Sequence, residues 1–263
     1  MLCSSLSFFL YEQIMDLGLK GKSVLITGAS KGIGLACAKA FAAEGCDVHL
    51  AARSADLLAA AAIDIQTKYS VKVVTHICDL RAEGAVKQLA DACSAVDVLV
   101  NNAGDIPGGN IETVDEAKWR HAWELKVFGY INLTRAMLAH MKPRGKGVIV
   151  NVIGMAGVTH PPEYICGTMG NAALEAFTKG VGKGSIEYGV RVLGMHPPST
   201  RTDRIIQLYK TISKTKFGDE SHWEELLSQT RMIEPEQVAD TVLFFASERA
   251  NHLSGVMLNL GTY

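Results

Sequence analysis

Residues 23–34 read SVLITGASKGIG, and this stretch decides the fold. A short aliphatic run ends in a loop with glycines at positions 28, 32 and 34, and a segment with helical periodicity follows over 32–44. Glycines at such positions allow a tight turn, let backbone N–H groups approach a pyrophosphate, and let the helix pack closely on the strand. The helix N-terminus adds partial positive charge. The stretch therefore predicts a strand, a phosphate-binding loop and a helix.

The rest of the chain repeats this alternation of short apolar runs with longer helical segments. Further strands are expected over 47–52, 72–79, 96–104, 147–154, 190–197 and 256–261, and further helices over 54–68, 82–93, 113–141 and 164–187. Near-continuous Val, Ile and Leu runs are typical of parallel strands buried on both faces, and crossovers of helix length indicate a doubly wound sheet. With no linker or repeat, the sequence predicts one α/β domain over 19–263.

The composition excludes several classes of partner. The 263 residues are 48% hydrophobic and 20% charged, with a formal net charge of -1, so no basic field attracts nucleic acid or anionic lipid. Six scattered cysteines form no C-x-x-C pair, and no His/Cys cluster at metal spacing is visible. We therefore expect a reduced, cytoplasmic protein that binds no nucleic acid, membrane or metal.

Residues 1–18 are expected to be an N-terminal extension. They are mildly apolar, too short to span a bilayer, and lack a basic start and a small-residue cleavage site. A disordered or loosely docked segment is the first interpretation, and anchoring on a partner subunit is the alternative. Met15 also suits the start of the domain.

The chain resembles the short-chain dehydrogenase/reductase family over about residues 19–261. The glycine spacing G-x-x-x-G-x-G, the motif Asn101-Asn102-Ala103-Gly104, the pair Asp79-Leu80, and the segment from Pro197 to Thr202 carry this resemblance, although Pro198 replaces the family's glycine. It implies a Rossmann-like seven-stranded parallel sheet, a homo-oligomer (dimer or tetramer) and a nicotinamide cofactor. The cofactor residues that it implies are Gly28, Ser30, Lys31, Gly32, Ile33, Gly34, Arg53, Asp79, Leu80, Asn102, Ala103, Gly104 and Thr202.

The charges near the end of the second strand favour NADP(H) over NAD(H). NAD users usually hold the adenosine ribose with an acidic side chain at this point, where the chain has Ala52. Arg53 follows, and Lys31 lies inside the glycine loop. Two cations without a carboxylate suit a 2′-phosphate through charge-assisted hydrogen bonds. The alternative is that both are solvated surface charges.

All four catalytic positions implied by the resemblance are substituted. The match of Ala173, Leu174 and Thr178 to the family pattern sets the register, which places the serine, tyrosine and lysine positions on Gly154, Gly167 and Asn171. The family's helical asparagine corresponds to Lys126. Shifting the register so that Tyr164 is the family tyrosine puts Thr168 at the lysine position, and we reject it.

Three interpretations of this substituted site remain open. In the first, Lys126 and Tyr164 rebuild a catalytic site, because burial and a neighbouring cation shift pKa values toward neutrality. In the second, the protein is a catalytically silent NADP(H)-binding sensor or scaffold. A non-redox lyase or isomerase is the third. His160 is a candidate proton shuttle, whereas His196 is expected to satisfy backbone groups.

The segment 203–233 is expected to be a substrate lid. Its apolar side chains indicate a hydrophobic or aromatic substrate, and packing on its own domain or on a partner subunit is the alternative. A second apolar stripe, Trp119, Trp123, Val127, Tyr130 and Met137, fits either a buried helix face or a subunit interface. The leading prediction is an NADP(H)-dependent oxidoreductase acting on a small apolar carbonyl or alcohol.

Overall fold

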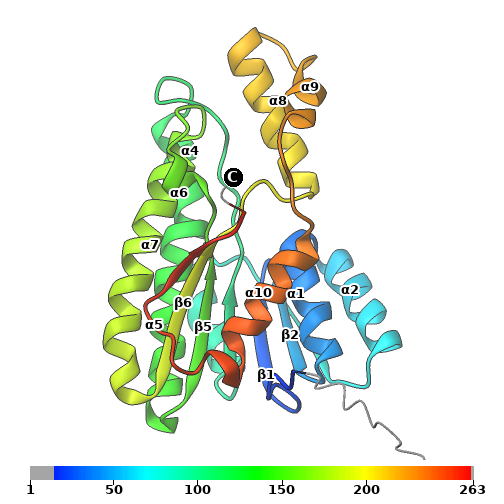
Figure 1. The fold of residues 1–263 in the computed structure, drawn as a ribbon, viewed down its shortest axis with the longest axis vertical. Coiled ribbons are helices and arrows are strands. Elements are labelled where there is room, and N and C mark those ends of the chain that lie inside the picture. The colour runs from blue at the N-terminus through cyan, green and yellow to red at the C-terminus, as the bar shows by residue number, and fades with distance from the viewer. Residues whose placement is uncertain (1–14, 262–263) are drawn as a thin grey trace, which may run out of the picture.

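The computed structural model describes residues 15–261 and is built on a seven-stranded parallel sheet (Figure 1). The strands follow the order β3-β2-β1-β4-β5-β6-β7, so the order reverses between β1 and β4. Their bounds are β1 Ser23–Thr27, β2 Asp47–Ala52, β3 Val73–Ile77, β4 Val98–Asn101, β5 Gly147–Val152, β6 Val190–His196 and β7 Met257–Asn259. The predicted doubly wound, single-domain α/β fold is confirmed.

Helices cover both faces of the sheet (Figure 1). One face carries α1 (Gly32–Ala43), α2 (Ala55–Lys68) and α10 (Pro235–Ala246), and the other carries α3 (Ala85–Ala92), α5 (Gly129–Met141) and α7 (Ile165–Ser185). Shorter or peripheral elements are α4 (Glu116–Trp123), η1 (Glu124–Phe128), η2 (Lys142–Arg144), α6 (Ala156–Thr159), η3 (Ile186–Tyr188), α8 (Asp203–Phe217), α9 (Trp223–Ser228) and η4 (Glu248–Ala250). The sequence did not single out α6 or α10.

The long helix predicted over 113–141 is interrupted. The segment begins at Glu116, and residues 124–128 form a π-helical turn that contains Lys126. Such turns are often found at functional sites because the extra residue changes the direction of nearby side chains. On this helix Val127, Tyr130 and Met137 are buried in the chain's own core, so these three belong to a buried face and not to a subunit interface.

The start of the described chain packs against η4. Residues 1–14, most of the predicted extension, lie outside the described residues. Of the part that is described, the backbone oxygen of Leu17 accepts from Glu248 N at 3.1 Å, and that of Asp16 accepts from Arg249 Nε at 2.9 Å. No helix within residues 15–261 has both the length and the apolar character needed to cross a membrane.

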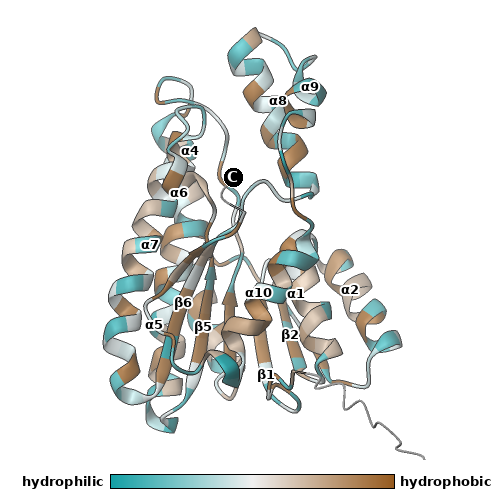
Figure 2. Cartoon of the chain, in the orientation of Figure 1, coloured by the Kyte–Doolittle hydropathy of each residue, from teal (hydrophilic) through white to brown (hydrophobic). Residues whose placement is uncertain are grey.

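The α8–α9 pair projects beyond the carboxyl edge of the sheet (Figure 1). Figure 2 shows mostly apolar central strands, whereas α8 and α9 alternate between hydrophobic and hydrophilic residues. Within α8 only Ser213 is buried, and its large aliphatic side chains are half-buried. The pair therefore has little core of its own, which leaves its apolar side chains available to line a cavity.

Two glycines in α7 provide a test of how tightly this helix packs. A Cβ at Gly182 would lie 2.3 Å from Gly255 N and 2.5 Å from Val192 O, whereas nothing lies within 4 Å of one at Gly184. Gly182→Ala should lower the free energy of unfolding by about 1–3 kcal/mol through overpacking. Gly184→Ala, the matched control, should raise it by roughly 0.5–1 kcal/mol because alanine favours the helix. Urea denaturation measures both, and equal effects would contradict the packing.

Candidate active site

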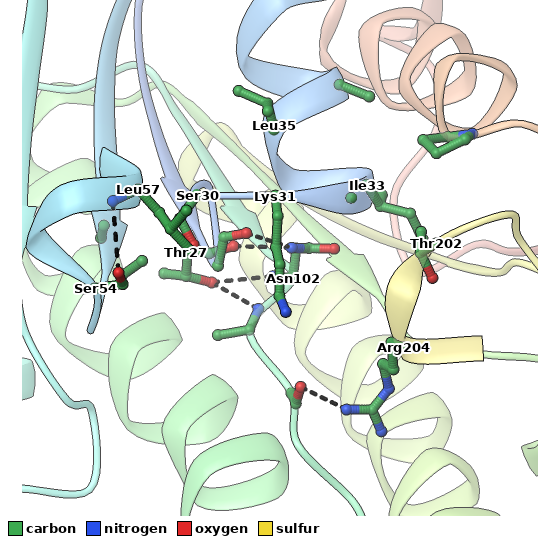
Figure 3. A pocket seen from close by; sticks show the side chains of 18 of the residues that line it. Thr27, Ser30, Lys31, Ile33, Leu35, Ser54, Leu57, Asn102, Thr202 and Arg204 are labelled. Atoms are coloured by element: carbon green, nitrogen blue, oxygen red, sulfur yellow. Dashed lines mark hydrogen bonds between the residues drawn. The ribbon is translucent and has the colours of Figure 1, made fainter. Parts of the chain in front are cut away.

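A first cavity, of about 600 Å³, opens at the carboxyl ends of β1 to β4. In open α/β sheets ligands bind where the strand order reverses, and this cavity lies at that point. Figure 3 shows Thr202 and Arg204 reaching it from the segment that leads into α8. The predicted cofactor residues that line it are Gly28, Ser30, Lys31, Gly32, Ile33, Arg53, Leu80, Asn102, Ala103, Gly104 and Thr202. Gly34 and Asp79 are the two predicted residues that do not.

Gly34 does not line the cavity but allows α1 to pack closely on β1. A Cβ at this position would lie 2.2 Å from the Gly28 carbonyl oxygen and 2.6 Å from Asn102 Nδ2. These distances are far below van der Waals contact, so α1 can start this close to β1 only without a side chain at position 34. The close helix–strand packing expected of the glycine loop is therefore present.

Asp79 forms an ion pair with Arg81. Its carboxylate accepts from Arg81 Nε at 2.9 and 3.1 Å and from Nη2 at 2.6 Å, and these hydrogen bonds lower the pKa of the Asp79 carboxyl. The adjacent Cys78 and Leu80 contribute the cavity wall instead. In this structure Asp79 therefore orders the end of β3 through Arg81.

A hydrogen-bonded clamp joins β1 to β4 at the cavity floor (Figure 3). Thr27 Oγ1 accepts from the backbone N–H of Asn102 at 3.0 Å and of Ala103 at 3.1 Å. In return, Asn102 Nδ2 donates to the carbonyl oxygens of Thr27 at 3.0 Å and Gly28 at 3.4 Å. The clamp holds the glycine loop in place, with Gly28 at a φ of 67°.

The residues of this cavity fit a dinucleotide phosphate. Lys31, the N-cap of α1, provides no side-chain cap, so among the described residues the N-cap side chain leaves the first N–H groups of the helix open to another acceptor. An anion at this helix end would satisfy them. Lys31 is exposed, and the half-exposed Arg53 lies 3.3 Å from Asp105 in a surface ion pair, which is a weak class of interaction. Both cations can therefore reach a ligand phosphate at little cost.

A second cavity of about 580 Å³ adjoins the first and shares Ile33, Asn102, Gly104, Thr202 and Arg204 with it. Its wall is mainly apolar, with Ile106, Val152, Ile153, Met155, Ile205, Leu208, Tyr209 and Ile212 among its members. Lys126, Tyr164, Gly154 and Asn171 line the same cavity. The structure thus brings both predicted catalytic residues to one place, next to the dinucleotide cavity.

Lys126 is a buried lysine of η1 whose side chain reaches the end of β5. Only 7% of the residue is exposed, and Nζ donates to Tyr130 Oη at 3.0 Å, Val152 O at 2.9 Å and Ile153 O at 3.1 Å. Burial, and to a lesser extent the charge of Arg204, lowers the pKa of the Lys126 ammonium from 10.5 to about 7. A group with this pKa exchanges its proton near neutral pH.

Tyr164 takes the room left by Gly167. It precedes α7, and a Cβ at Gly167 would lie 2.0 Å from Tyr164 Cε1 and 2.3 Å from Cζ. The phenol ring therefore lies against the α7 backbone where a side chain at position 167 would stand. Its Oη accepts from Arg204 Nη2 at 3.2 Å.

Gly154 and Asn171, the other two positions that the sequence analysis singled out, contact each other. Asn171 Nδ2 donates to the carbonyl oxygen of Gly154 at 3.2 Å. That oxygen also accepts from Nδ1 of the buried His196 at 2.8 Å, which confirms that His196 satisfies a backbone group. The other ring nitrogen of His196 lies 2.9 Å from a carboxylate oxygen of Glu175, a partner the sequence did not indicate. His160 is exposed and lies outside both cavities.

Arg204 is the site residue that sequence reasoning missed. It donates to the carbonyl oxygens of Gly104 at 2.8 Å and Ile106 at 3.1 Å and to Tyr164 Oη. It lines both cavities. Its position two residues after Thr202, at the start of the predicted lid, was visible in the sequence. Its contacts with Gly104 and Tyr164 were not, because these residues are far from it along the chain.

Comparison with known proteins assigns the chain to a family. A sequence model of the family described as short chain dehydrogenase matches residues 22–212. The chain belongs to this family. The 7alpha-hydroxysteroid dehydrogenase of Escherichia coli K12 is 30% identical over 254 residues, covering 93% of this chain and 94% of that protein.

Two solved structures of relatives carry nicotinamide cofactors. The L-sorbose reductase of Gluconobacter frateurii, complexed with NADPH and L-sorbose, is similar with a TM-score of 0.85 and 30% identity, over 95% of this chain and 100% of that one. A 3-ketoacyl-(acyl-carrier-protein) reductase of Brucella melitensis, complexed with NADH, has a TM-score of 0.79 and 25% identity, over 92% and 97% of the two chains. Solved structures of this fold are therefore found in complex with either cofactor.

The free energy of unfolding should rise with pH through Lys126. The folded protein releases the Lys126 proton near pH 7, whereas the unfolded chain keeps it until about pH 10.5, so the unfolded state binds more protons in this window. From pH 7 to 9 the wild type should gain about 2 kcal/mol relative to Lys126→Met. Urea denaturation at both pH values measures this gain, and a constant difference between the two proteins would contradict it.

Proposed function

We propose that this protein is an NADP(H)-dependent oxidoreductase that acts on a small apolar carbonyl or alcohol through a rebuilt catalytic site. One observation carries the proposal: a buried lysine with a pKa near 7 and a tyrosine standing in for the missing side chain at Gly167 share a cavity that adjoins the dinucleotide cavity. Membership of an oxidoreductase family supports the same conclusion.

Residues of the glycine loop and of the end of β2 would hold the cofactor. The uncapped N-terminus of α1 suits the pyrophosphate, and Lys31 and Arg53 suit the 2′-phosphate of NADP(H). NADP(H), when bound, supplies or accepts the hydride. The NADPH complex of the related L-sorbose reductase supports NADP(H) as the cofactor. The related 3-ketoacyl reductase is complexed with NADH, so NAD(H) is the alternative that the binding experiment must distinguish.

Tyr164 and Lys126 would divide the proton chemistry between them. Reduction of a carbonyl leaves an alkoxide, which needs a nearby acid. Tyr164 is the proposed donor, because its phenol lies in the cavity wall with a cation at its oxygen. Lys126 is the proposed buried charge, whose field stabilises negative charge that develops in a water-poor cavity.

The substrate class follows from the cavity wall. Ile205, Leu208 and Ile212 of α8 face the same cavity as Ile153 and Met155 beyond β5. An apolar cavity with few polar groups binds an apolar ligand and uses the polar groups to orient it. Closure of a lid over such a ligand excludes water from the reacting group.

A catalytically silent NADP(H)-binding protein is the second candidate, and one observation favours it. An ammonium group has three N–H donors, and Lys126 Nζ has three acceptors within the chain. Lys126 can therefore serve as a structural tie between η1 and the end of β5 without any role in chemistry.

Cofactor choice can be measured with Arg53→Ala. Loss of a cation that contacts the 2′-phosphate should weaken NADPH binding by about 10- to 100-fold, since a charge-assisted hydrogen bond contributes about 1.5–3 kcal/mol. NADH binding should change less than about threefold, because NADH lacks that phosphate. Fluorescence titration gives both affinities, and Lys72→Ala is the control. If Arg53→Ala lowered the affinities for NADPH and NADH equally, the assignment of NADP(H) would be wrong.

Catalysis can be measured as NADPH consumption over a panel of aliphatic, aromatic and steroid-like ketones. Lys126→Met and Tyr164→Phe should each lower the rate on the order of 10²–10⁴-fold, the usual contribution of a general acid. Lys118→Met, a surface lysine on α4, should leave the rate unchanged.

The outcomes separate the two candidates. Tight NADPH binding by wild type without turnover of any ketone favours the silent protein. Turnover that survives both Lys126→Met and Tyr164→Phe shows an oxidoreductase whose acid lies elsewhere, and it overturns the rebuilt site.

A further inference from the structure

Three side chains from distant parts of the chain converge on the α3 side of the sheet, away from both cavities. His49 Nδ1 of β2 and His76 Nε2 of β3 lie 3.0 Å apart. Cys93 Sγ, just after α3, lies 3.5 Å from the first nitrogen and 3.4 Å from the second. Each residue thus aims one ligand atom at a common point.

The spacing of these three atoms matches that around a tetrahedral zinc ion. With Zn–N near 2.0–2.1 Å and Zn–S near 2.3 Å, tetrahedral ligand atoms are about 3.3–3.6 Å apart. The two N···S distances fall in this range, and the N···N distance is only slightly shorter. Small side-chain rotations would open the pair to the ideal value.

Hydrogen bonding alone does not account for the triangle. In the neutral state each facing ring nitrogen either carries a proton or offers a lone pair, and the thiol carries one proton. If one ring nitrogen donates and the other accepts, two protons are available for three close contacts, so at most two of the contacts are ordinary two-centre hydrogen bonds. A cation, by contrast, uses a lone pair from all three atoms at once.

The surroundings suit a three-ligand site with one further position. Cys93 is buried, whereas both histidines are half-buried at the sheet edge formed by β3, so an ion can enter and water can complete the coordination. The rings of His49 and His76 lie nearly parallel, with an angle of 13° between their planes. The strands fix this arrangement, because Ala51 pairs with His76 and His49 with Val74.

We propose that His49, His76 and Cys93 bind Zn²⁺, with water as the fourth ligand, and that the ion fastens β2, β3 and the end of α3 together. β3 is a short edge strand, Val73–Ile77, and among residues 15–261 it pairs with β2 alone. A metal cross-link across this edge constrains it from the α3 side. His49 and His76 stand two residues before Ala51 and Cys78, which line the first cavity, so the ion would also brace that wall. The proposal does not depend on the proposed function.

Cobalt(II) is the probe for the test, because a thiolate ligand gives Co²⁺ a near-ultraviolet charge-transfer band. The full-length, reduced protein should bind one equivalent of Co²⁺ with this band and with visible bands typical of tetrahedral coordination, and Zn²⁺ should displace it. Cys93→Ser should abolish the charge-transfer band. Both Cys93→Ser and His76→Gln should weaken Zn²⁺ binding by more than the ~10- to 100-fold loss that outer-shell changes cause.

Two matched variants provide controls. Cys46→Ser removes a buried thiol that packs on the other face of the sheet, and His140→Gln removes a histidine on α5; both should keep the band and the affinity. Zn²⁺ should also raise the melting temperature of wild type but not of His76→Gln, because a ligand that binds only the folded state stabilises it.

The proposal fails if wild type takes up no Co²⁺, or if Cys93→Ser keeps the charge-transfer band. Should Cys93→Ser not fold, His76→Gln decides the matter: a folded variant with unchanged Zn²⁺ affinity overturns the site, and one with lost affinity supports it.

Discussion

The contact between the start of α1 and the ends of β1 and β4 constrains everything else in this structure. The Gly28 carbonyl lies so close to Gly34 that no side chain fits there, and Asn102 ties the same carbonyl to β4. Because the strand order reverses between β1 and β4, this contact also sets where the sheet opens. Asn102 and Gly104 line both cavities. The cofactor residues and the candidate catalytic residues therefore lie on either side of this contact.

The sequence predicted the parts of the molecule that local chemistry controls. The alternation of apolar runs with helical segments gave the sheet and most of its helices, because strand burial and helix periodicity are visible within about ten residues. The glycine loop was equally visible, since its spacing is set by the turn itself. The position of Tyr164 beside Gly167 was accessible for a similar reason: it lies three residues before Gly167, within one turn of the same chain segment.

Contacts between distant segments were not accessible in this way. Arg204 meets Gly104 and Tyr164 only because α8 folds back over the β4–α4 loop. The π turn around Lys126 breaks a segment whose periodicity reads as one helix. The sequence analysis expected no His/Cys cluster, and it missed the group of His49, His76 and Cys93, which are 27 and 17 residues apart and meet through strand register and the end of α3.

Side chains from nearby positions occupy the space beside Gly154 and Gly167. Tyr164 stands over Gly167, and Asn171 lies against Gly154, so a side chain at either glycine would meet a neighbour. The phenol is held by Arg204, which also ties the start of α8 to Gly104 and contributes to the low pKa of Lys126. A displacement of α8 would therefore alter both the contacts of Tyr164 and the electrostatic field at Lys126. In this protein the start of α8 and the side chain of Tyr164 are joined through one guanidinium group.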